Sequence, residues 1–162
     1  MRTFTLILSV LAVVLCGCRS DVPTIPLSFY TVSEEKIDGG QYIDTSDFPK
    51  LGYVATTPDL VITRLADVYQ TEPQAGVIIG GKLVSPPAGR SALGIELRPD
   101  DAQKLSKFSE QIIGKHLLMM LGEKPLMAPG VQAVLTTQRL LLEFPTQAER
   151  DNVRSELRKL VR

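Results

Sequence analysis

The sequence of 162 residues lacks tryptophan and contains one histidine and two cysteines. With so few aromatic residues there is little on which nucleic-acid bases could stack, and a single histidine rules out a multi-histidine metal centre. The cysteines are only two positions apart, so they cannot form a disulfide that joins distant parts of the chain. Basic and acidic residues balance at 18 each, without the excess of positive charge that nucleic-acid binding favours. We therefore expect no nucleic-acid partner, no metal and no cofactor.

The residues that could carry catalysis have simpler structural explanations. His116 follows a Gly-Lys pair at the start of an apolar run, and the sequence contains no Gly-x-Ser-x-Gly motif to supply a nucleophile. Asp100 and Asp101 come directly after Pro99, where negative charge stabilises the first turn of a helix. We expect no catalytic residue, and we predict that the protein is not an enzyme.

The N-terminus has the pattern of an export signal. Arg2 precedes an apolar run over residues 6–15, broken only by Ser9, which is too short to span a bilayer stably and is typical of a secretory signal. The run ends in Leu15-Cys16-Gly17-Cys18, which resembles the bacterial lipobox, with small residues before the cysteine that receives the lipid. Residues 1–17 are therefore predicted to be a lipoprotein signal peptide, and Cys18 the lipidated residue.

The alternative is an ordinary cleaved signal with two incidental cysteines. The lipoprotein interpretation accounts for the charge, the apolar run and the small residues together, and several acyl chains would anchor the protein stably. Arg19 stands where an aspartate retains many lipoproteins in the inner membrane. In a Gram-negative cell we therefore expect the outer membrane, with the protein facing the periplasm.

The next segment is predicted to be a tether. Residues 18–49 include Pro23 and Pro26 and few apolar residues, which disfavours helix, although residues 28–32 could form a short strand. Residues 57–76 leave two possibilities open, a helical turn begun by Thr57 and Pro58, or an extended segment. The folded domain is expected over residues 50–162.

The second half of the chain alternates between strand and helix patterns. Pro99 and Gly114 mark the start and stop of one amphipathic helix, and the Thr146–Glu149 capping box begins another. A Gly-Gly pair predicts a hairpin turn or a bulge within residues 77–84, and residues 116–121 are apolar on both faces. The predicted class is α+β, with a small mixed or antiparallel sheet covered on one face by two amphipathic helices, residues 99–114 and 146–161.

The order of several short motifs resembles a known family. The run from Ile95 to Ala102, the Gly114-Lys115 pair, the apolar strand that ends in Gly122, and Ala128-Pro129 are similar to the head of the first periplasmic domain of SecD, an accessory subunit of the protein translocase. The resemblance covers about half of the chain after the signal. It implies a domain that binds proteins or peptides, but no segment resembles the membrane helices of SecD or their proton-pathway carboxylate.

One charged feature remains. Arg150, Arg154, Arg158 and Arg162 recur at intervals of four and lie on one broad face of the last helix. They are candidates for contact with anionic lipid headgroups or an acidic partner. The alternative is a solvated face whose later cations suit the C-terminal end of the helix.

Two functions follow from these observations. The first is a membrane-anchored envelope lipoprotein whose SecD-head-like domain binds a protein or peptide without catalysis, through exposed sheet edges and the loop at residues 85–90. The second is a structural or assembly lipoprotein that contacts an envelope complex or anionic lipid and has no role in protein translocation.

Overall fold

The computed structural model describes residues 24–72, 77–79, 82–84 and 91–161. The predicted signal peptide, Cys18, the loop at residues 85–90 and Arg162 lie outside these residues. Within the described ranges, no helix combines the length and apolar character that a membrane crossing needs.

The larger of the two main sheets contains a strand from the predicted tether. Its order is β10-β9-β1-β4, with β1 at Leu27–Val32, β4 at Leu60–Ile62, β9 at His116–Leu121 and β10 at Lys124–Met127. β1 pairs with β9 along its whole length, antiparallel, from Leu27 opposite Leu121 to Val32 opposite His116. Leu27 and Phe29 are completely buried. The prediction of a tether up to residue 49 is therefore wrong, because the folded part includes β1.

The second sheet has three antiparallel strands in the order β11-β8-β5. These strands are β5 at Leu65–Thr71, β8 at Ser91–Leu97 and β11 at Arg139–Phe144. β4 and β5 together show that residues 60–71 are extended, the second of the two possibilities for this segment. β-branched residues such as Val61, Ile62 and Val68 favour this conformation.

Two small hairpins complete the strands. β2 at Gln41–Ile43 pairs with β3 at Gly52–Val54, and β6 at Val77–Ile79 pairs with β7 at Lys82–Val84. The second pair shows a hairpin rather than a bulge, the first of the two possibilities for residues 77–84.

Both predicted helices are present. α1 spans Pro99–Gln111, and Gly114 at φ 86° follows it in the left-handed region. In its first turn the Asp101 carboxylate accepts a hydrogen bond of 2.7 Å from the Lys104 ammonium group, which raises the pKa of Lys104 above its usual value.

The second helix, α2, spans Gln147–Arg158 and begins at the predicted cap. The Thr146 hydroxyl accepts a hydrogen bond of 3.2 Å from the Glu149 N–H, which is half of the capping box. The Glu149 carboxylate makes an ion pair of 2.7 Å with Lys124 of β10. The side chain that was expected to complete the cap therefore joins α2 to the four-stranded sheet.

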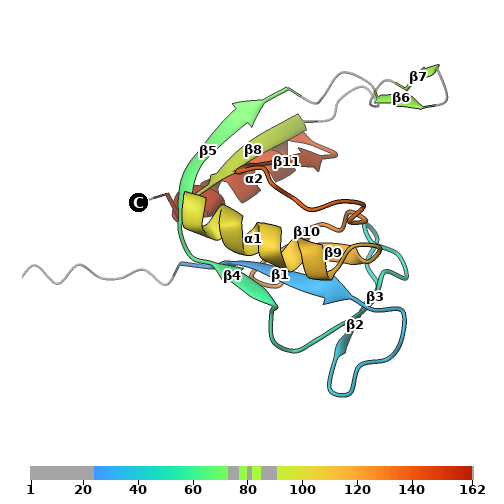
Figure 1. Ribbon diagram of the computed structural model, residues 1–162. Coiled ribbons are helices and arrows are strands. Elements are labelled where there is room, and N and C mark those ends of the chain that lie inside the picture. Colours follow the sequence, from blue (N-terminus) through green and yellow to red (C-terminus); the bar gives the residue numbers. More distant parts are fainter. Residues whose placement is uncertain (1–23, 73–76, 80–81, 85–90, 162) are drawn as a thin grey trace, which may run out of the picture.

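A single main core lies between the two sheets. Figure 1 shows α1 between β5 and β8 on one side and β1 and β4 on the other. Both helices contribute apolar side chains to this core, and so do one face of the three-stranded sheet and one face of the four-stranded sheet. The α+β class is confirmed, with antiparallel sheets and two helices. α2 packs on β5, β8 and β11 of the three-stranded sheet, and α1 packs on β4 of the four-stranded sheet. The four-stranded sheet on the other side of α1 was not expected.

β9 is buried on both faces, as its sequence predicts. Leu117 and Met119 enter the main core, while Leu118 and Met120 pack in a second, smaller core. Val54 of β3 and Ile43 of β2 belong to this second core. The β2–β3 hairpin thus covers the face of β1 and β9 that points away from the main core.

Candidate functional site

A groove of about 570 Å³ runs between edge strands of the two main sheets. One wall comes from β10 and the residues after it, and the opposite wall from β11 and the start of α2. The loop between β2 and β3 adds Asp47 and Phe48. The remaining lining residues are Pro125, Leu126, Met127, Ala128, Pro129, Leu141, Glu143, Phe144, Pro145 and Glu149.

The two edge strands differ in how well they could accept another strand. In the part of the chain that the structure describes, β11 pairs only with β8, and β10 only with β9. β10 carries Pro125, which has no N–H, and its register shifts between Pro125 and Met127, two features that discourage pairing at a sheet edge. β11 is regular over six residues and contains no proline. β11 is therefore the edge that can receive an additional strand.

The groove is apolar at its floor and acidic at its rim. Leu126 and Phe144 are buried, while Leu141 and Met127 are half-buried and line the groove. Leu141 does not belong to either apolar core, so its side chain is available to a ligand rather than needed for folding. The acidic residues of the lining are Asp47, Glu143 and Glu149. Such a surface suits apolar side chains whose neighbours are polar or basic.

One ion pair joins the two walls of the groove. The ion pair of 2.7 Å between Lys124 and Glu149 joins the start of β10 to the first turn of α2. The Lys124 side chain is 46% exposed, so this pair contributes little to stability.

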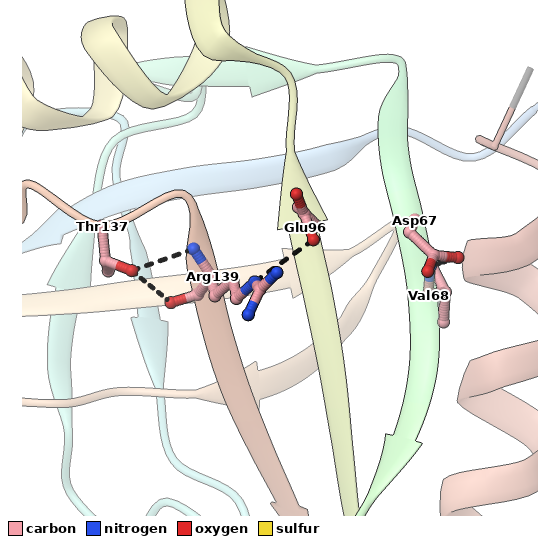
Figure 2. A network of polar contacts seen from close by, with 5 residues as sticks. All are labelled: Asp67, Val68, Glu96, Thr137 and Arg139. Carbon is pink, nitrogen blue, oxygen red and sulfur yellow. Dashed lines mark hydrogen bonds and ion pairs between the residues drawn. The ribbon is translucent and has the colours of Figure 1, made fainter.

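Side chains cover the middle of the outer face of the three-stranded sheet, the face that points away from the main core. A Cβ atom at Gly94 would overlap the ring of Tyr69, so this ring occupies the place of a side chain on β8. Beside it, Arg139 of β11 makes an ion pair of 3.2 Å with Glu96 of β8 (Figure 2). Because the ring and the ion pair cover this face, the sheet offers its edge rather than its face to a ligand.

A threonine fixes the beginning of β11. The Thr137 hydroxyl accepts a hydrogen bond of 3.0 Å from the Arg139 N–H and donates one of 3.1 Å to the Arg139 carbonyl oxygen (Figure 2). These bonds satisfy the first backbone groups of the strand. The backbone groups toward Phe144 are those that border the groove.

The arginines that were predicted to lie on one face of the last helix differ in their contacts. Arg150 makes an ion pair of 2.9 Å with Asp151, and its side chain is only 16% exposed. Arg154 and Arg158 line a shallow depression of about 420 Å³, together with Gln70, Asp151 and Ser155. Arg162 and the predicted lipidation site, Cys18, lie outside the described residues. The structure thus brings two of the four arginines together.

The other residues considered for chemistry do not line the groove between β10 and β11. His116 is exposed, pairs with Gly130 in an isolated bridge, and lines a different pocket with Lys115 and Glu34. Asp100 and Asp101 lie in the first turn of α1. Within the described ranges no cluster of three or more His, Cys, Asp or Glu side chains could hold a metal ion.

Comparisons with known proteins identify the fold but not a family. No protein-family model matches the chain, and no curated protein matches it. Among solved structures it is similar to SecDF, described as a membrane component that enhances protein export, with a TM-score of 0.60 and 20% identity over 83% of this chain and 62% of that chain. SecDF in a super-membrane-facing form gives a TM-score of 0.59 and 20% identity over 83% of this chain and 18% of that chain.

These similarities define the class of fold. The chain has a SecD-like fold, as the motif order predicts, and it spans less than two thirds of either SecDF chain. The structural likeness extends over more of the sequence than the motifs do, because it includes strands that have no sequence signature of their own.

Proposed function

We propose that the protein is an exported lipoprotein, anchored through Cys18 to the outer membrane and facing the periplasm, whose SecD-head-like domain binds extended segments of other proteins. Binding takes place in the groove between β10 and β11 and involves no catalysis. The export signal and the Leu-Cys-Gly-Cys motif support the anchored location. The similarity to SecDF, which enhances protein export, supports a role with exported polypeptides.

The observation that carries this proposal is the β11 edge inside an apolar groove. A ligand strand on β11 would form backbone hydrogen bonds irrespective of its sequence, along the part of the strand beyond Arg139, whose own N–H and carbonyl oxygen are already bonded to Thr137. Ligand side chains at every second position would lie beside Leu141, on the outer face of the sheet, and those between them would face Met127 across the groove. This mode selects unfolded segments with apolar residues at every second position. In a folded protein such segments are already paired and buried, so they cannot bind here.

A charge placed on the floor of the groove tests this mode. Replacing Leu141 with glutamate is expected to weaken the binding of an extended, alternating apolar peptide about tenfold or more, because the apolar contact is lost and a charge is desolvated. Fluorescence anisotropy with a labelled peptide measures the change in Kd.

The matched control is Val61→Glu. Val61 is 41% exposed and lies on β4, the opposite edge of the four-stranded sheet, so the same charge is added away from the groove. We expect Val61→Glu to leave the Kd unchanged. Equal weakening in both variants, or no peptide binding by the unmodified protein, would contradict the proposal.

A further inference from the structure

Two arginines of α2 have no ionic partner in the described part of the chain. Their neighbours on the helix are paired, Arg150 with Asp151 and Lys159 with Glu156. Arg154 and Arg158, one turn apart, line the same shallow depression, and no ion pair involves either of them within the described ranges. This depression therefore carries two positive charges that the folded chain does not neutralise.

Arg154 is the more constrained of the two. Its Nε atom is buried and has no hydrogen-bond partner within the described structure, which is a costly arrangement for a charged group. The planar guanidinium group is well matched to the oxygens of a phosphate, which can accept two parallel hydrogen bonds. Ser155 and Gln70 line the depression as well and offer further donors.

The negative groups near the depression offset only part of this charge. Asp151 is the one carboxylate of the lining, and it already makes an ion pair with Arg150. The C-terminal end of α2 contributes about half a negative charge. Against two unpaired guanidinium groups, the balance still favours an anion.

The position of the depression points to the membrane. Leu27, where β1 begins, lies opposite Ile62, and the N–H of the nearby Leu65 donates a hydrogen bond of 3.0 Å to the Leu160 carbonyl oxygen. The chain therefore enters the domain at the end where α2 finishes, since Leu65 also forms an isolated bridge with Val161, which follows that helix. Residues 19–26 can separate Cys18 from Leu27 by at most about 30 Å.

We propose that Arg154 and Arg158 bind the phosphate of an anionic lipid headgroup in the membrane that carries the anchor. This inference rests on the proposed lipidation of Cys18, because the anchor is what keeps the domain at the surface. Exposed charges act over about 8 Å at physiological salt, and the connection is short enough for the domain to rest on the bilayer, where lipid phosphates would attract the arginines.

Binding in this way would orient the domain. The groove is lined by Phe144 at the end of β11 and by Glu149 in the first turn of α2, whereas Arg154 and Arg158 lie in the second half of this helix. The 12 residues of α2 span about 18 Å. With its C-terminal end at the bilayer, α2 would direct the groove away from the membrane, toward passing polypeptides.

Vesicle flotation tests the site without the anchor. The chain of residues 18–162 with Cys18→Ser contains every residue that the structure describes, so it carries the complete fold. It is expected to float with vesicles that contain phosphatidylglycerol and not with phosphatidylcholine alone. Replacing both Arg154 and Arg158 with glutamine is expected to lower the partition coefficient about 30-fold, since each cation near an anionic surface contributes about 1 kcal/mol.

A control with the same loss of charge separates the site from a general charge effect. Lys50 and Lys115 are exposed and lie together near His116, at the opposite end of β1 from Leu27. Replacing both with glutamine is expected to leave the partition coefficient unchanged. Matching thermal unfolding midpoints would establish that both double variants are folded.

Three results would overturn the inference. The first is an equal loss of the partition coefficient in the two double variants, and the second is no flotation with anionic vesicles. The third is binding of inorganic phosphate by the two arginines without any binding to vesicles. The last would identify a free-phosphate site instead of a lipid site. Because the chain used here carries Cys18→Ser and no lipid, its flotation does not depend on whether Cys18 is acylated. Lipidation of Cys18 is tested separately, in the full chain.

Discussion

Replacing Phe29 with alanine is expected to lower the free energy of unfolding by about 3–5 kcal/mol. Phe29 lies in the middle of β1, is completely buried, and faces Leu60 on one neighbouring strand and Met119 on the other. Removing its ring leaves a cavity between the two main sheets, where the surrounding strands cannot easily collapse. Urea unfolding followed by circular dichroism gives the free energy.

Phe108→Ala is the matched control. Phe108 of α1 is half-buried at the margin of the same core, so solvent or neighbouring side chains can fill the space that its ring leaves. We expect a smaller loss than for Phe29. A cost below about 1 kcal/mol for Phe29→Ala would mean that residues 27–32 do not belong to the folded unit and would favour a tether.

Replacing Cys18 with serine is expected to abolish membrane anchoring altogether. Serine has no thiol to receive the diacylglyceryl group, so the chain would lose the mass of its acyl groups and its membrane association together. Expression of the full chain in a bacterial host, followed by detergent phase separation and intact-mass measurement, checks both.

The control for this change is Cys16→Ser. Cys16 lies two residues before the proposed cleavage site, where another small residue is acceptable, so this variant should remain lipidated. Unchanged mass and membrane association in Cys18→Ser would contradict the assignment. A loss of acyl mass and membrane association in Cys16→Ser alone would assign the anchor to Cys16 instead.

The parts of the fold that the sequence predicts correctly are those with local signals. Pro99 and Gly114 bracket α1, and Thr146 caps α2, because helix ends are determined by the residues at the ends. The double-sided apolar pattern of β9 likewise identifies a strand covered on both faces.

The four-stranded sheet could not be predicted in the same way. β1 has a short and unremarkable sequence, and its partner β9 lies about 90 residues further along the chain. Pairing over such a distance depends on which faces meet in three dimensions, and no local pattern records it. The same reason explains why the groove was not foreseen, since the residues that form it come from three separate parts of the sequence.

The arginine face was predicted in part. A helical period places Arg154 and Arg158 on one face of α2, and the structure brings both to one depression. The period does not reveal that Arg150 is turned toward Asp151, because the direction of a long side chain depends on its neighbours.

The measurement that tests the central claim most directly is photocrosslinking in living cells from a photoreactive amino acid at position 141, compared with the same amino acid at position 61. We predict that position 141 captures newly exported polypeptides before they fold, and that position 61 does not. Capture of a single fixed envelope protein, of lipid alone, or of the same products from both positions would contradict the assignment of the groove to extended polypeptides.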